Sequence, residues 1–261
     1  MNDEALSGAL AGLCVLVTRP EPQAQRLAER LQAHGAVALT APLLTLRALP
    51  APPSLHGDYD ALVVTSVPAA QHYALAMTGR VLPLALPVFA VGEATAEAMR
   101  ALGFEQVTTP PRDAETSEGL LALPALRARL GERLLLLRGR GGRDALAQAA
   151  SAAGGALAVA ELYERVLPAR DWPAEVTRWR AAELAAVLVT SGETLDNLVL
   201  VTPVVWRDWL CQRLLVVPSA RVAEQAGERG FVHVVDANGA SDEAMAAALM
   251  AAVPMNQKDG A

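Results

Sequence analysis

The chain has 261 residues, of which 52% are hydrophobic and 19% are charged, and its formal net charge at pH 7 is −6. A chain of this length and apolar content can bury one large core or two smaller ones, which excludes an intrinsically disordered protein. The acidic balance disfavours binding to nucleic acid or to an anionic membrane. Cys14 and Cys211 have no metal-ligand spacing, so neither a metal site nor a disulfide framework is predicted and a reducing compartment is expected.

The chain ends predict a cytoplasmic protein. Asp3 and Glu4 stand where a secretory signal would carry cations. The first apolar run, residues 13–17, is too short to span a bilayer. The polar segment after Pro254 is expected to be disordered.

Short, nearly continuous apolar runs alternate with stretches of helical periodicity along the chain. Such runs are typical of strands buried on both faces of a parallel sheet, which predicts an α/β fold. The first helical stretch, 20–35, is expected to carry Pro20 in its first turn and to end at Gly35. The predicted strands are 13–18, 61–66, 88–92, 106–110, 133–139, 185–191, 214–219 and 232–237.

The chain also resembles itself at long spacing. A Gly-Phe pair at 103–104 recurs at 230–231, an offset of 127 residues (230 − 103), and an Ala-Glu pair repeats at the same offset. Thr-Ser pairs end two predicted strands at 65–66 and 190–191. A repeat of this length predicts two similar α/β domains.

Two extended segments, 38–54 and 156–173, are predicted to join these domains. Each combines alternating apolar residues with prolines, as in a crossing strand rather than a helix. Two such crossings place the first strand with the C-terminal half of the chain.

Polar residues gather where the predicted strands end. The carboxyl ends of parallel strands meet at one edge of a sheet, where ligands bind, and free N–H groups at helix starts there can bind anions. A Ser or Thr at such a position can also cap its helix without any ligand. The candidates are Thr18, Arg19, Thr65, Ser66, Arg138, Gly139, Thr190, Ser191 and Ser219, with Thr95, Ser117 and Ser241 at comparable helix starts.

The segment GRGGRD at 139–144 follows a predicted strand and matches part of a dinucleotide-binding fingerprint. Asp144 replaces the third glycine of that fingerprint, and its charge would repel a pyrophosphate. Glu161 lies near the usual distance for the ribose-binding acid. A nucleotide-binding oxidoreductase therefore stays an alternative.

An ordered set of segments resembles the uroporphyrinogen-III synthase family over about residues 13–250. The segments are VLVTRPEPQAQRLAERLQAHGA, ALVVTS, AVGEATAEAMRALGF, LLLRGRGGRDALAQAASAAGGALAVAELYERV, AAVLVTSGETLDNL, VVPSARVAEQAGERGF and VVDANGASDEAMAAAL. The resemblance implies two flavodoxin-like parallel-sheet domains joined by a two-stranded linker, with the substrate in the cleft between them. The implied bounds are 1–41 plus 168–261 for one domain, 48–161 for the other, and 42–47 and 162–167 for the connecting strands.

The resemblance also implies a lyase of porphyrin and haem biosynthesis that acts on hydroxymethylbilane, a linear tetrapyrrole with eight carboxylates. Loss of its terminal hydroxyl as water gives an azafulvene. The substituted carbon of the last pyrrole, ring D, then attacks to form a spiro intermediate, which reopens and closes with that ring inverted. The task is mainly to hold one conformation, since the substrate also cyclises unaided to the symmetric isomer.

No metal or other cofactor is required by this chemistry. The family is usually monomeric, so a monomer is expected, and transient contact with neighbouring pathway enzymes is left open. A two-domain small-molecule binding protein without catalysis, or a degenerate relative that kept the fold and lost turnover, also remains an alternative.

Tyr163, in AELYERV, matches a tyrosine that the family carries in the strand leading back between the domains. A phenol there can assist the departing hydroxyl as an acid. Taken alone, the residue would be a half-buried strand tyrosine used for packing. Arginines near the strand ends can pair with the acetate and propionate groups, although two or three of them are expected to be solvated surface residues. These arginines are Arg19, Arg138, Arg140, Arg143 and Arg221.

Overall fold

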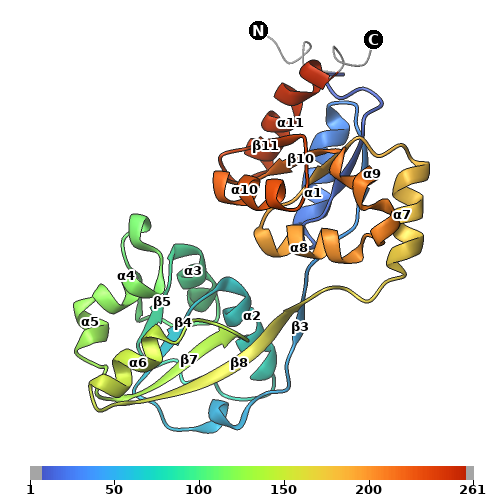
Figure 1. The fold of residues 1–261 in the computed structure, drawn as a ribbon. Coiled ribbons are helices and arrows are strands. Elements are labelled where there is room, and N and C mark those ends of the chain that lie inside the picture. The colour runs from blue at the N-terminus through green and yellow to red at the C-terminus, as the bar shows by residue number, and fades with distance from the viewer. Residues whose placement is uncertain (1–7, 257–261) are drawn as a thin grey trace. The chain divides into compact units, whose positions relative to one another are not determined.

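The computed structural model describes residues 8–256 (Figure 1). It divides into two compact units, unit 1 with residues 1–45 and 166–261 and unit 2 with residues 46–165. The acidic N-terminal positions and the last five residues of the predicted disordered tail lie outside the described part. Helix α11 (Asp242–Asn256) passes through Pro254, so the tail prediction is wrong for the first two residues after it.

Unit 1 is built on a five-stranded sheet in which every neighbouring pair is parallel. In chain order within the unit this is the 2-1-3-4-5 arrangement of flavodoxin-like folds. The central strands are wholly apolar and buried because helices cover both faces of the sheet. The strand order is β2 (Val37–Thr40), β1 (Cys14–Val17), β9 (Ala186–Leu188), β10 (Leu214–Val217) and β11 (Val234–Asp236).

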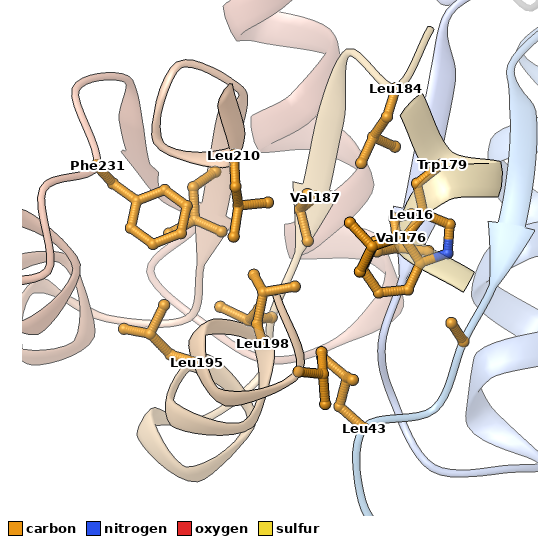
Figure 2. Packing of buried hydrophobic residues seen from close by; sticks show 14 of the residues in the cluster. Leu16, Leu43, Val176, Trp179, Leu184, Val187, Leu195, Leu198, Leu210 and Phe231 are labelled. Carbon is orange, nitrogen blue, oxygen red and sulfur yellow. The ribbon is translucent and has the colours of Figure 1, made fainter. Parts of the chain in front are cut away.

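One face of this sheet packs against α1 (Gln23–Ala33) and α11. The other packs against α7 (Trp172–Ala181), α8 (Gly192–Val201), α9 (Arg207–Cys211) and α10 (Ala220–Glu228), with the short turn η3 (Val204–Trp206) before α9. Figure 2 shows part of this second core, which includes Trp179 of α7 and Leu16 of β1. Burial of such side chains supplies most of the stability of a helix that is short on its own.

Unit 2 contains a six-stranded sheet. Five of its strands are parallel and, read from β7 onward, again follow the order 2-1-3-4-5, so unit 2 is a circular permutation of unit 1. This arrangement explains the repeat in the sequence. The strand order is β3 (Thr45–Ala48), β8 (Ala156–Val166), β7 (Arg133–Gly139), β4 (Ala61–Val64), β5 (Val88–Ala90) and β6 (Val107–Thr108).

The segment that begins with β3 lies antiparallel to β8, the long yellow strand in Figure 1. The backbone N–H of Leu49 donates to Leu162, and the hydroxyl of Ser54 donates to Val159, so partner numbers fall as the chain advances. The segment 38–54, predicted as a single extended crossing, therefore contributes to both sheets, because Val37–Thr40 is the edge strand β2 of unit 1.

Helices cover both faces of the unit 2 sheet as well. One face, called the α2 face below, packs against α2 (Val67–Ala76) and α3 (Glu93–Ala101). The opposite face, called the α6 face, packs against α4 (Ser117–Ala122), α5 (Pro124–Arg127) and α6 (Ala145–Ala152). Short turns η1 (Pro53–His56) and η2 (Arg112–Ala114) complete the unit.

All eight predicted strands are present, each shortened or unchanged in extent. The predicted start of the first helix is wrong: α1 begins at Gln23, because Pro22 occupies the N-cap and a proline disfavours helical backbone in the residue before it. The predicted end is confirmed, since Gly35 follows the C-cap with φ of +91°. Between residues 8 and 256, no helix has both the length and the apolar character needed to cross a membrane.

Candidate functional site

A pocket of about 120 Å³ lies at the carboxyl edge of the unit 2 sheet, where β7 and β4 end side by side. This is the point at which the strand order reverses, the usual ligand position in a doubly wound sheet. The pocket gathers six residues that the sequence marked separately. They are Thr65, Ser66, Arg138, Gly139, Arg140 and Tyr163.

Tyr163 is the centre of this pocket. Its side chain is 4% exposed, and its phenol oxygen lies 3.0 Å from the hydroxyl of Ser66. Ser66 caps α2, since its hydroxyl accepts a hydrogen bond from the backbone N–H of Ala69 at 3.1 Å. The ring of His72 lies 5.2 Å from the tyrosine ring and is tilted by 33°. The tyrosine is therefore held by a helix start on one side and a ring on the other.

Gly139 is required by the close approach of the tyrosine. A Cβ atom at this position would lie 2.6 Å from Cζ of Tyr163 and 2.9 Å from its hydroxyl oxygen, closer than real contacts allow. The first glycine of GRGGRD thus makes room for an aromatic ring.

A β-bulge sets the direction of the tyrosine. Arg138 pairs with Glu161 and Gly139 pairs with Tyr163, so Leu162 has no partner of its own in β7. Bulges of this kind re-aim side chains beside active sites. As a result Leu162 and Tyr163, although adjacent in sequence, both pack into the core of the α2 face.

The α6 face of the same edge carries a network of opposite charges. The Arg138 side chain is 13% exposed and lies 3.2 Å from Asp144 and 3.4 Å from Glu161. Arg140 lies 2.8 Å from Glu164 and 3.6 Å from Glu161. Both arginines also line a second, shallower hollow of about 430 Å³ on this side. Their charge is largely neutralised by the chain's own carboxylates.

The network also answers the dinucleotide hypothesis. Glu161 binds two arginines and accepts from the backbone N–H of Gly141 at 3.4 Å, so it is not free to bind a ribose. Asp144 occupies the N-cap position of α6, where a pyrophosphate would lie.

Three predicted residues of unit 2 lie outside the pocket. Thr95 is buried in the first turn of α3. Ser117 is the first residue of α4, whose cap is Thr116 instead, and Arg143 is exposed and lies 2.7 Å from Glu118.

At the carboxyl edge of unit 1, the two residues that follow β1 bind to other residues of the same unit. Thr18 is fully buried, and its hydroxyl donates to the carbonyl of Leu188 at 2.7 Å. Arg19 forms an ion pair with Asp242, and its side chain is 17% exposed. The Thr18 hydroxyl and the Arg19 charge are therefore both engaged within the chain.

The remaining predicted residues of unit 1 are mostly helix caps. Ser191 accepts from the N–H of Thr194 at 3.1 Å and caps α8, with the half-buried Thr190 before it. Ser241 accepts from the N–H of Ala244 at 3.1 Å. Ser219 occupies the N-cap position of α10 without a side-chain bond, and Arg221 is exposed and forms no salt bridge with any residue from 8 to 256.

Sequence reasoning missed Arg165, which lines the pocket beside Tyr163. It stands two residues further along the same strand, and residues two apart on a strand share a face. That spacing was the available signal, although charged residues near a strand end are usually solvated.

The other two tyrosines of the chain lie at the opposite, amino edge of the unit 2 sheet. Both line an apolar pocket of about 170 Å³ there. Tyr59 donates to the carbonyl of Ser54 at 2.6 Å, and burial raises the pKa of Tyr73 to about 12. Within the described residues, no three His, Cys, Asp or Glu side chains gather as metal ligands would.

Comparisons with known proteins identify the family. The family model for uroporphyrinogen-III synthase (HemD) matches residues 25–247. Uroporphyrinogen-III synthases of Salmonella typhimurium and Escherichia coli are each 35% identical over 247 residues, covering 91% of this chain and 100% of theirs. A solved uroporphyrinogen-III synthetase from Helicobacter pylori, 16% identical, shares the fold with a TM-score of 0.57 over 93% of this chain and 99% of its own. A solved mutant uroporphyrinogen III synthase of Thermus thermophilus, 20% identical, gives 0.56 over 94% and 99%. This chain belongs to the uroporphyrinogen-III synthase family.

Proposed function

We propose that this protein closes hydroxymethylbilane to uroporphyrinogen III, with loss of water and inversion of ring D. The observation that carries the proposal is the family match over residues 25–247 together with relatives 35% identical over almost the whole chain. The reaction is a lyase step of porphyrin and haem biosynthesis. The substrate's carboxylates make it a strong anion, so a protein of net charge −6 needs local positive groups to hold it.

In this proposal Tyr163 is the acid that assists the departing hydroxyl. Its phenol gives a proton to the hydroxyl as the carbon–oxygen bond breaks, so that water leaves and the azafulvene forms. The substituted carbon of ring D attacks the azafulvene to give the spiro intermediate, which reopens. The unsubstituted α-carbon of ring D then forms the last ring bond and loses its proton, and the phenolate takes a proton back. One proton is given and one returned, with water as the only by-product.

The surroundings of Tyr163 support this role. Ser66 already accepts a hydrogen bond from Ala69, and its own proton can point to the phenol oxygen 3.0 Å away. The phenol then donates to the substrate while Ser66 stabilises the negative charge that develops on the oxygen. The start of α2 adds a favourable dipole at the same place.

We assign the substrate contacts to predicted residues near the strand ends that are at least partly exposed and form no salt bridge with the described residues. In unit 2 these are Thr65, Ser66 and the backbone at Gly139. In unit 1 they are Thr190, Ser219, Arg221 and the backbone N–H groups that follow Ser191. Single contacts of this kind share the work, so each is expected to matter less than Tyr163.

The test is Tyr163→Phe, with Tyr73→Phe as the matched control that removes a hydroxyl at the opposite edge. We expect the first variant to lower kcat by about 10²-fold or more and the second to leave it unchanged. The measurement is the rate of formation of uroporphyrinogen III, separated from the symmetric isomer. Full activity of Tyr163→Phe would make the tyrosine a packing residue.

The wild-type protein tests the function itself. An excess of the asymmetric isomer over the spontaneous product is expected. If the protein binds the bilane yet only the spontaneous isomer forms, it is a binding protein or an inactive relative, and a thermal shift with a nicotinamide dinucleotide would favour an oxidoreductase.

We also propose that the protein acts as a monomer in the cytoplasm, as the family resemblance implies. Sedimentation at assay concentration tests the first part, and cell fractionation tests the second.

A further inference from the structure

The bulge in β8 changes which residues share a face of the strand. Before it, Ala158, Ala160 and Leu162 point to the α2 face while Val159 packs on the α6 face. After it, Tyr163 continues on the α2 face. Glu164 bonds to Arg47 and Arg140, on the side opposite Tyr163.

Arg165 therefore follows Tyr163 on the same face, and both side chains line the same pocket. Without the extra residue the alternation would put Tyr163 on the α6 face with Glu161. The bulge thus turns both the phenol and the guanidinium, which share a face by their spacing, toward the pocket on the α2 face. Residues two apart on a strand are separated by about 7 Å, a distance within the size of one substituted pyrrole.

Arg165 is also the uncompensated cation of this pocket. Three arginines line it, and two of them, Arg138 and Arg140, are held by Asp144, Glu161 and Glu164. Arg165 is exposed and forms no salt bridge with any side chain in the described part of the chain. The guanidinium of Arg165 is therefore available to bind an anion that enters the pocket.

We infer that Arg165 binds a carboxylate on the pyrrole that carries the departing hydroxyl, and so places that hydroxyl at the phenol of Tyr163. This inference rests on the proposed function. A guanidinium suits the task because its planar fork can grip a carboxylate with two parallel hydrogen bonds. The contact serves both binding and alignment, so its loss is expected to affect KM and kcat together.

The first experiment replaces Arg165 with Gln and with Lys in the full-length protein. Arg80→Gln is the matched control, because Arg80 is exposed in the same unit and follows α2 at the amino edge of the sheet. Among the described residues its side chain hydrogen-bonds only to His56. We expect Arg165→Gln to raise KM by about 10-fold or more, Arg165→Lys to recover part of the loss, and Arg80→Gln to behave as wild type.

The second experiment changes the substrate instead of the protein. In a bilane whose hydroxymethyl-bearing pyrrole carries methyl esters in place of its acids, the Arg165 contact is already missing. Wild type and Arg165→Gln are then expected to show the same KM. Raised salt should weaken binding of the natural bilane more steeply in wild type than in Arg165→Gln.

The outcomes separate the two proposals. If wild type makes no excess of the asymmetric isomer, the proposed function fails. If wild type makes it and Arg165→Gln matches Arg80→Gln with the natural bilane, the Arg165 assignment is overturned. The ester comparison also decides the case in which Arg165→Gln is less stable, because a folding defect would lower the rate equally for both substrates and would not raise KM for the natural bilane alone.

Discussion

The two sheets have the same strand order but differ in what their equivalent edges carry. At the end of the first strand of each sheet stands a mostly buried arginine that the chain itself neutralises. Arg138 lies within β7 and pairs with Asp144 and Glu161, and Arg19 lies two residues after β1 and pairs with Asp242. The neighbouring strands differ: β2 ends at Thr40, whereas β8 continues to Val166. The shared topology therefore gives each sheet a carboxyl edge where a ligand can bind. Whether reactive side chains stand at that edge depends on the length of the strand beside the first one, β2 in unit 1 and β8 in unit 2.

The end of β2 shows why unit 1 lacks such groups. Pro42 follows shortly and removes a backbone donor, and the next two residues, Leu43 and Leu44, are buried leucines. In unit 2 the strand β8 instead passes the pocket, bulges at Leu162 and presents a phenol and a guanidinium. The following experiments test whether this difference between the edges is a difference in function.

Among these experiments, the largest effect is expected from Gly139→Ala. The added methyl group would overlap the ring of Tyr163, which must then shift. A displacement of about 1 Å in a catalytic group can cost about 10²-fold in rate, so kcat is expected to fall by that order. Gly227→Ala in α10 of unit 1, where nothing lies within 4 Å of the new carbon, is the control. Equal kcat in both variants would contradict the claim that the Tyr163 ring must lie this close to Gly139.

Arg19→Gln is expected to affect stability rather than substrate binding. Removing Arg19 leaves the mostly buried Asp242 with only a distant partner, Arg26 at 3.9 Å. The free energy of unfolding should fall by about 1–3 kcal/mol while KM stays near wild type. Arg30→Gln, which breaks the exposed pair with Glu243, should cost less than about 1 kcal/mol. Denaturant titration measures the free energy of unfolding, and steady-state kinetics measure KM. A raised KM for Arg19→Gln would show that Arg19 binds the substrate.

The equivalent serines give the most direct comparison of the two edges. Ser66 and Ser191 both cap helices, so replacing either with Ala should lower stability by about 1 kcal/mol. Only Ser66 touches Tyr163, and we expect only Ser66→Ala to lower kcat, by about 10-fold. Thermal unfolding and turnover are measured for both variants. Equal turnover would show that the Ser66 hydroxyl does not assist Tyr163 in catalysis.

The smallest effect is a change in acid stability. The hydrogen bond from Arg47, and then the Arg140 charge, hold the pKa of Glu164 below its ordinary value. A lowered folded-state pKa stabilises the fold above the unfolded pKa of about 4.3, and this contribution is lost as pH falls through the folded value. The free energy of unfolding of Glu164→Gln should therefore be lower than that of wild type at pH 7, and the two values should converge in acid. Denaturant titration across this pH range measures the difference. A difference that grows toward low pH would contradict the lowered pKa of Glu164.

The elements that could be predicted from sequence are those fixed by local pattern. The apolar runs became strands because only strands buried on both faces are apolar throughout, and the Thr-Ser pairs marked equivalent edges because both units share one topology. The role of Tyr163 came from family resemblance. The spacing of Arg165 from Tyr163 puts both on one face of the strand, but which face could not be predicted, because the bulge that turns both toward the pocket depends on the register of β7 with β8. The pairing of Arg19 with Asp242, 223 residues apart, likewise needs the folded chain.

The insertion of unit 2 into unit 1 orders events during synthesis. Val15 of β1 pairs with Ala186 of β9, so the centre of one sheet joins residues 171 positions apart (186 − 15). Unit 2 uses only contiguous residues, and the nascent chain can complete its sheet while β1 still lacks its central neighbour. A folded insert brings the two flanking segments together and shortens the loop that unit 1 must close. Until β9 is synthesised, the four apolar residues of β1 lack the central neighbour that buries one side of the strand in the finished sheet.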